Sequence, residues 1–307
     1  MLLYTKENYD LVKVAKLYYE QDLTQQEIAG RMKLSRPQIS KMLTKARRLG
    51  IVHISVNDNL MNENYHQLLQ QLCRTYKLAG GAILPDREDV HAMVADAAEY
   101  WGMETQYERQ IGLGWGYLIG ELVDKLGEER LKKLEGEIYP LIGEIAIPNR
   151  GYRVNEMVEQ LAYALGRQPS LLRLDAFVTS LEEKEQLEQQ PDFLRLAGKW
   201  KNVDICLLAL QNYPSVPDEA TEMRFGSVLR TQRAVGSFLS YFYNLNGDIL
   251  SGENDFALRA SLADLRHSRK VYGVGLVASR ECILGALRTG IFTHIILTER
   301  QARSVLG

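Results

Sequence analysis

Cysteine is scarce in this sequence, and long apolar runs are missing. Among its 307 residues the three cysteines, Cys73, Cys206 and Cys282, are too few and too far apart for a disulfide framework or a zinc site. No apolar run approaches the roughly 20 residues that a bilayer-spanning helix needs. The first residues, MLLYTKENYD, lack the apolar core of a secretion signal. These absences favour a cytoplasmic protein with reduced thiols, and we expect no cofactor and no metal.

Acidic residues are absent from residues 31–48, a stretch that holds seven Lys or Arg. Residues 1–56 contain ten Lys or Arg and five Asp or Glu, whereas the rest of the chain contains 27 against 34, so the net charge of −2 hides a basic N-terminal region. A basic small region joined to an acidic large one indicates that only the first binds a polyanion.

Two short helices separated by a turn are predicted between residues 23 and 48. Thr24 is placed as an N-cap with Glu27 three residues later, which makes a capping box. Ser35 is placed as the N-cap of the second helix, with a proline in the first turn. Helix-turn-helix motifs need a small residue where the helices cross and apolar residues ten and thirteen positions later, which this sequence provides at Ala29, Ile39 and Met42.

The turn and the segment after the second helix complete this interpretation. Lys33 occupies the turn position where glycine is usual, so the turn signal is imperfect. Residues 51–56 alternate apolar and polar side chains like a short strand, which would be the wing of a winged helix-turn-helix. We therefore expect a winged helix-turn-helix domain at residues 1–57 and a linker helix at 58–78.

The start of the second helix is best placed to read DNA bases, because recognition helices contact base edges with their N-terminal residues. Arg can bridge guanine O6 and N7, and Gln can bridge adenine N6 and N7. Thr24 and Gln25, at the start of the preceding helix, are placed to hold a phosphate through backbone N–H groups and side chains, and the later cations position the second helix on phosphates. The predicted DNA contacts are Thr24, Gln25, Ser35, Arg36, Gln38, Lys41, Lys45 and Arg48. A solvated basic surface helix is the alternative interpretation. Because half-sites usually come in pairs, we expect a homodimer or homotetramer on double-stranded operator DNA.

From Ala79 onward, short apolar runs alternate with amphipathic helical stretches such as 116–126 and 154–165. This alternation predicts an α/β domain with a mostly parallel sheet covered on both faces. The expected strands lie at 80–84, 109–114, 138–143, 172–178, 203–210, 234–239, 271–277 and 294–298.

A glycine-rich segment, Gly112-Leu113-Gly114-Trp115-Gly116, follows one expected strand and precedes a helix. Glycines there let the backbone approach an anion, and the helix N-terminus supplies free N–H groups. Such turns also serve close packing alone, and Trp115 either stacks on a ligand or is buried. The residues by themselves leave both alternatives open.

The whole chain resembles the SorC family of sugar-responsive bacterial transcriptional regulators. The specific match is LTQQEIAGRMKLSRPQISKMLTKARRLGIVHISV, and looser matches are IGLGWGYLIGEL, AVGSFLSYFYNLNG, ALRASLADLR and CILGALRTGIFTHIILTERQA. The resemblance implies that residues 79–307 form a Rossmann-like effector-binding and oligomerisation domain of the sugar-phosphate isomerase type. It also implies a small-molecule effector, a phosphorylated sugar.

The chain departs from the family pattern at several places in the expected pocket. Tyr117 follows the Trp-Gly pair where the family has a nearby Thr or Ser, neutral Ser237 and Asn244 replace two acids, and Ser279 with the adjacent Arg280 replaces a lysine segment. The effector-binding residues that we expect are Gly114, Trp115, Gly116, Tyr117, Asn155, Ser237, Asn244, Ser279 and Arg280, with Arg150 and Arg153 as reserve contacts. Because a site that hydrogen-bonds different groups rejects the usual ligand, we expect either an atypical effector or a degenerate pocket.

An enzyme is the main alternative: a sugar-phosphate isomerase or deaminase with a DNA-binding appendage. Such chemistry needs a positioned acid or base, and the neutral residues at 237 and 244 argue against it. An architectural DNA-binding protein is a second alternative, but that role does not need a large α/β domain. We therefore predict a transcriptional regulator, not an enzyme, whose operator affinity depends on a metabolite.

Overall fold

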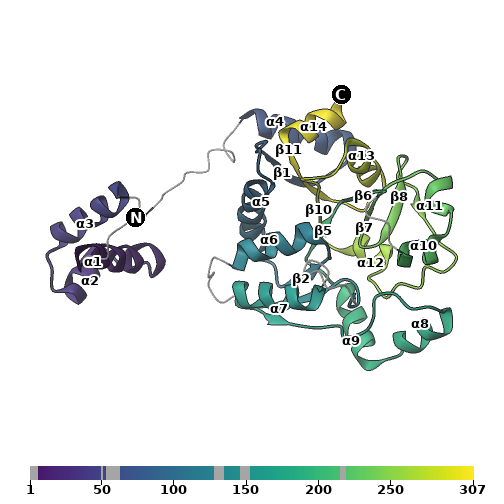
Figure 1. The fold of residues 1–307 in the computed structure, drawn as a ribbon, viewed down its shortest axis with the longest axis horizontal. Helices are drawn as coiled ribbons and strands as arrows, with labels where there is room; N and C mark the ends of the chain where they lie inside the picture. The colour runs from purple at the N-terminus through teal and green to yellow at the C-terminus, as the bar shows by residue number, and fades with distance from the viewer. Residues whose placement is uncertain (1–5, 50, 53–62, 128–134, 146–152, 215–218) are drawn as a thin grey trace. The chain divides into compact units, whose positions relative to one another are not determined.

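A computed structural model describes residues 6–49, 51–52, 63–127, 135–145, 153–214 and 219–307 (Figure 1). The chain divides into two compact units, Met1–Asp58 and Asn59–Gly307, and each is described by itself. Among the described residues, no helix has both the length and the apolar character needed to cross a membrane.

The N-terminal unit is a small helical bundle. Its elements are α1 (Lys6–Ala15), the π-helical turn η1 (Lys16–Glu20), α2 (Gln25–Met32) and α3 (Arg36–Arg48). Val14, Ile28 and Ile39, one from each α-helix, are completely buried against one another. The predicted wing at 51–56 falls mainly outside the described residues, since only residues 51 and 52 are described and they form a bend.

Helix α4 (Glu63–Tyr76), which falls in the segment predicted as a linker, packs onto the C-terminal unit. Its Leu68 and Leu72 are buried in that unit's core, and the hydroxyl of Tyr76 donates to the carbonyl oxygen of Val305 across 2.7 Å. The helix therefore contacts strand β1 and helix α14 along its apolar face.

The C-terminal unit is built on a seven-stranded sheet in which every pair of neighbouring strands is parallel, in the order β1-β11-β10-β5-β2-β3-β4. This confirms the predicted α/β fold. The strands are β1 (Gly80–Leu84), β2 (Gln110–Leu113), β3 (Glu137–Pro140), β4 (Gln168–Pro169), β5 (Ile205–Ala209), β10 (Lys270–Val274) and β11 (His294–Thr298).

Helices cover both faces of this sheet (Figure 1). Alternate residues of β5 enter different cores: Leu207 faces one layer of helices and Leu208 faces the other. The first layer contains α5 (Val90–Thr105), α6 (Tyr117–Gly127) and α7 (Val154–Leu165). The second contains α4, α9 (Pro191–Trp200), α12 (Leu262–His267), α13 (Arg280–Arg288) and α14 (Glu299–Leu306). Shorter helices are α8 (Leu181–Glu188), α10 (Glu219–Phe225) and α11 (Val228–Thr231).

Two of the predicted strands are wrong: one belongs to a second, antiparallel sheet, and the other is not a strand. It contains β6 (Gln211–Asn212), β7 (Ala234–Phe238), β8 (Tyr241–Asn244) and β9 (Ile249–Leu250). The run at 234–239 joins this sheet because Leu239 and Ser240 adopt left-handed backbone angles and fold it into a hairpin with β8. The run at 172–178 is not a strand but makes isolated bridges to Glu144 and Ala257.

Candidate nucleic-acid interface and effector crevice

The start of α3 is closed by a reciprocal capping box. The Ser35 hydroxyl oxygen accepts from the backbone N–H of Gln38 at 3.4 Å. In return, the side-chain oxygen of Gln38 accepts from the backbone N–H of Ser35 at 2.8 Å and from its hydroxyl at 2.9 Å. The predicted cap is therefore confirmed, and Gln38 is part of it. Because Ile39 and Leu43 are buried, the exposed Arg36 and Gln38 lie on the outer side of α3.

The start of α2 has the same arrangement with a carboxylate. The Glu27 side chain accepts from the backbone N–H and the hydroxyl of Thr24, both at 2.8 Å, and the Glu27 N–H donates to the Thr24 hydroxyl at 3.3 Å. These hydrogen bonds from Thr24 lower the pKa of Glu27. The predicted capping box is confirmed, but it commits the Thr24 hydroxyl and N–H to Glu27. The first-turn N–H groups of Gln25 and Gln26 remain for an incoming phosphate.

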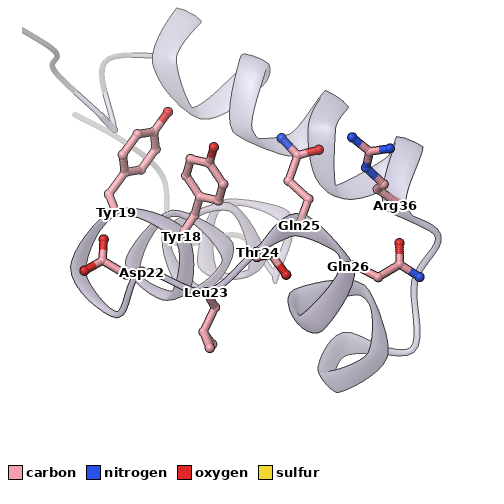
Figure 2. A pocket seen from close by; sticks show the side chains of 8 residues that line it. All are labelled: Tyr18, Tyr19, Asp22, Leu23, Thr24, Gln25, Gln26 and Arg36. Carbon is pink, nitrogen blue, oxygen red and sulfur yellow. The ribbon is translucent and has the colours of Figure 1, made fainter.

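A groove of about 760 Å³ joins the starts of α2 and α3 (Figure 2). Gln25 and Arg36 both line it, so the structure brings together a predicted phosphate contact and a predicted base contact. The groove is lined by Tyr18, Tyr19, Asp22, Leu23, Thr24, Gln25, Gln26 and Arg36.

The remaining predicted DNA contacts follow one side of α3. Lys41, Lys45 and Arg48 are spaced by four and three residues, which places them on one helical face. Lys41 and Arg48 are exposed and Lys45 is half-buried. The described part of α3 contains no acidic residue to offset these cations.

In the C-terminal unit, the strand order reverses between β2 and β5. From β2 the chain continues outward through β3 and β4, and it then returns to β5 beside β2 and continues in the other direction through β10 and β11. In open parallel sheets, ligands bind at the carboxyl ends of strands where the order reverses. The end of β2 is held to β5 there, because Gly114 donates its N–H to the carbonyl oxygen of Leu207 across 2.9 Å.

The predicted glycine-rich loop lies at this reversal point. A Cβ atom on Gly116 would stand 2.6 Å from the side-chain nitrogen of Gln211, and the φ angle of Gly116 is +120°, so only glycine fits. Trp115 is half-buried and packs between both cores, with its ring edge-on to Phe177 at a centroid distance of 6.2 Å. Helix α6 begins at Tyr117, and Gly116 provides no side chain to cap its first-turn N–H groups.

Two further residues predicted for the effector site reach this region. Ser237 is buried and pairs with Gln211 across β6 and β7. Ser279 caps α13, and its backbone N–H donates to the side-chain oxygen of Asn212 at 2.8 Å. Strand β6 therefore connects the glycine-rich loop to the start of α13.

Three other residues predicted for the effector site instead make hydrogen bonds that hold other parts of the fold. Asn155 holds the backbone of Leu172 with hydrogen bonds of 2.9 and 3.1 Å and lines a separate acidic cavity of about 330 Å³. The Asn244 side chain accepts from two backbone N–H groups in the β8–β9 turn. Arg280 donates to the carbonyl oxygen of Ser304 on α14. Arg153 pairs with Glu156, and Arg150 lies outside the described residues.

Three residues near the glycine-rich loop are absent from the predicted effector contacts. Gln211 and Asn212 come two and three residues after the end of β5, and this place after a strand is the signal that the sequence offers. Glu121, one turn into α6, accepts from the Tyr117 hydroxyl and lies 3.2 Å from Nδ1 of His91. The hydrogen bond to Glu121 raises the pKa of Tyr117. The region around the loop thus contains backbone N–H donors, the amide of Gln211 and the carboxylate of Glu121.

Comparisons with known proteins agree with this architecture. The family described as "Putative sugar-binding domain" matches residues 61–307. The sorbitol operon regulator of Klebsiella pneumoniae is 29% identical over 312 residues, covering 96% of each chain. The deoxyribonucleoside regulator of Bacillus subtilis (strain 168) is 26% identical over 308 residues, again covering 96% of each. The crystal structure of the full-length K. pneumoniae sorbitol operon regulator covers 99% of this chain and 100% of its own, with a TM-score of 0.77 at 24% identity, which shows a shared fold.

Proposed function

Because the chain belongs to the SorC family of sugar-responsive transcriptional regulators, we propose that a phosphorylated sugar bound in its C-terminal unit controls the affinity of its N-terminal unit for operator DNA. The observation that carries the proposal is the pairing of a capped basic helix with a glycine-rich strand–helix loop at the reversal point of a parallel sheet. The relatives compared above are named as regulators of a sorbitol operon and of deoxyribonucleosides.

The DNA half of the proposal assigns different roles to the two helix starts. Arg36, exposed at the start of α3, contacts a base edge, and Gln25, across the groove, contacts a phosphate. Lys41, Lys45 and Arg48 hold the backbone farther along α3. Since such modules read paired half-sites, the protein acts as a homodimer or homotetramer.

The effector half places the anionic group of the ligand at the start of α6. The N–H groups of its first turn bind the anion, since Gly116 supplies no capping side chain. Gln211 and Glu121 hydrogen-bond hydroxyl groups of the sugar. Arg280, Asn244 and Asn155 play a structural role in this proposal because their side chains bind the fold itself.

We assign the C-terminal unit a sensing role rather than catalysis. The relatives compared above are named as regulators. The acid Glu121 lies one turn into α6, and its carboxylate accepts from the Tyr117 hydroxyl and lies 3.2 Å from Nδ1 of His91. The purified protein should leave sugar phosphates unchanged, and their isomerisation or deamination would contradict this role.

The experiment measures DNA affinity with and without effector. Double-stranded DNA enriched by the full-length protein from a randomised library serves as the probe in fluorescence anisotropy, and sugar phosphates and the matching free sugars are titrated in turn. A coupling of about 1–3 kcal/mol changes the affinity roughly 5–150-fold. Light scattering on the same samples reports the oligomeric state.

Two glycine variants make the test specific to the crevice. Gly116→Ala should abolish the response to the sugar phosphate, because the added methyl group displaces Gln211 and strains the loop. Gly198→Ala, in α9 with open space around it, should keep the response. A protein that selects DNA but ignores every sugar phosphate would contradict the effector half, and one that enriches no DNA sequence would contradict the DNA half.

A further inference from the structure

We infer that Gln38 reads DNA only as a hydrogen-bond donor, so that it cannot make the two-bond contact with adenine and prefers guanine or thymine. This inference rests on the proposed DNA-binding function and names the base recognised by one residue of that interface. It replaces the adenine contact that the sequence indicated for Gln38.

The orientation of the Gln38 amide follows from its partner. The backbone N–H of Ser35, 2.8 Å away, can only donate, so the amide atom that faces it must be the oxygen. The Ser35 hydroxyl donates to the same oxygen at 2.9 Å, while its own oxygen accepts from the N–H of Gln38. The amide is therefore held in one orientation by two hydrogen bonds to its oxygen, and the backbone N–H of Gln38 closes the cap with a third.

This orientation decides what Gln38 offers to a base. A carbonyl oxygen has two lone pairs, and Ser35 uses both. The Gln–adenine contact needs the amide oxygen to accept from N6 and the amide nitrogen to donate to N7. Because the cap uses the oxygen, the NH₂ group is the part of the exposed Gln38 amide that is left to contact a base. In the major groove, a lone donor matches O6 or N7 of guanine or O4 of thymine. On adenine it reaches only N7, beside the N6 donor that repels it, so adenine is disfavoured.

The start of α2 gives a natural comparison. Glu27 occupies the same capping-box position there and makes the equivalent hydrogen bonds to Thr24. A carboxylate thus closes this type of cap as well as an amide does. A glutamate at position 38 would therefore keep the cap and replace the outward NH₂ by an oxygen, which exchanges a donor for an acceptor at one place.

The test compares the DNA sequences that full-length variants enrich from a library of double-stranded DNA with a randomised core. Gln38→Ala should lose base preference at one position of each half-site, and the wild-type protein should prefer guanine or thymine there. Gln38→Glu should prefer cytosine or adenine at that position, because the new oxygen accepts from N4 or N6. Its affinity for the wild-type sequence should fall about tenfold.

Glu27→Gln is the matched control, because it makes the reverse exchange at the same cap position of α2. It should enrich the wild-type sequence with equal or higher affinity. Circular dichroism of Gln38→Glu checks that the cap and the helix are kept. A wild-type preference for adenine or cytosine at the position sensitive to Gln38, or an unchanged preference in Gln38→Glu, would overturn the inference alone. A wild-type protein that enriches no sequence would overturn the proposed function together with it.

Discussion

Leu34 donates its backbone N–H to the carbonyl oxygen of Ala29 across 3.0 Å, which closes the turn between α2 and α3. Lys33, the residue before Leu34, lies in the left-handed region in this turn, with φ 54° and ψ 42°. Glycine is the usual residue at this position after a helix because it has no Cβ to clash with the backbone. The turn of the reading motif is therefore formed at some cost in conformational energy.

We predict that Lys33→Gly stabilises the N-terminal unit by about 1 kcal/mol, because glycine removes the left-handed strain. Hydrogen exchange of peptides covering residues 25–48 in the full-length protein measures the effect. Lys33→Ala is the control, since it removes the charge but keeps a Cβ at the same angles. Equal protection from hydrogen exchange in the two variants would show that the charge of Lys33, rather than backbone strain, lowers the stability of the turn.

Much of the N-terminal unit could be predicted because its signals are local. Thr24 and Ser35 predict where α2 and α3 begin, and both residues are the N-caps of these helices in the structure. The second half of the α3 box was also encoded, because Gln at the third helical position completes a capping box. What single residues could not show was that Gln38 cannot use the same oxygen for the cap and for a base.

The C-terminal unit shows a different limit. Its parallel strands are buried apolar runs, so their existence could be predicted, and the loop at Gly114–Tyr117 falls at the expected carboxyl end of β2. Periodicity does not identify the partner of a strand. It therefore predicts residues 234–239 in the parallel sheet, whereas they pair with β8 in the antiparallel sheet. Asn244 followed a family motif, yet its side chain binds its own turn.

A buried ion-pair cluster supports the hairpin of the second sheet. Asp255 accepts from Arg224 at 2.5 Å and from Arg259 at 2.6 Å, and all three side chains are at most 10% exposed. Arg224 also donates to the hydroxyl of Ser240 in the hairpin turn. Asp255→Asn should therefore cost about 3–5 kcal/mol in the free energy of unfolding, because it removes the charged carboxylate that both buried guanidinium groups bind.

Urea denaturation measures this loss against an exposed ion pair of the same unit. Arg153 and Glu156 are 2.8 Å apart, and their side chains are 46% and 49% exposed. Glu156→Gln should change stability by less than about 1 kcal/mol. A similar small loss for Asp255→Asn would show that water or backbone groups replace the carboxylate.

His294 should make the C-terminal unit sensitive to acid. Burial, helped by the positive charge of Lys270 and opposed by Glu104, lowers the pKa of His294 from 6.5 to about 4. As pH falls from 6.5 to about 4, His294 takes up a proton in the unfolded chain but not in the folded chain. The free energy of unfolding therefore decreases by at most about 1.4 kcal/mol per pH unit. His294→Phe, which keeps a ring against Tyr272, should remove this part of the decline. Thermal unfolding of both proteins between pH 4 and 7 measures the difference, and parallel pH curves would contradict it.

The two ends of α3 should respond differently to the loss of one positive charge. Arg36 lies in the groove beside the start of α2, whereas Arg48 lies in the last turn of α3, among cations assigned to phosphates. Arg48→Ala should weaken binding to all DNA sequences evenly and reduce the slope of log K against log salt concentration by about one. Arg36→Ala should cost roughly 1–3 kcal/mol of binding free energy on the enriched sequence and relax the preference at one base.

Arg303→Ala is the control. Arg303 is an exposed arginine on α14 that pairs with Glu299, so its loss should change neither the slope nor the base preference. If Arg36→Ala and Arg48→Ala lowered affinity equally on every sequence, the start of α3 would bind phosphates only, since a base contact cannot be lost without a loss of discrimination.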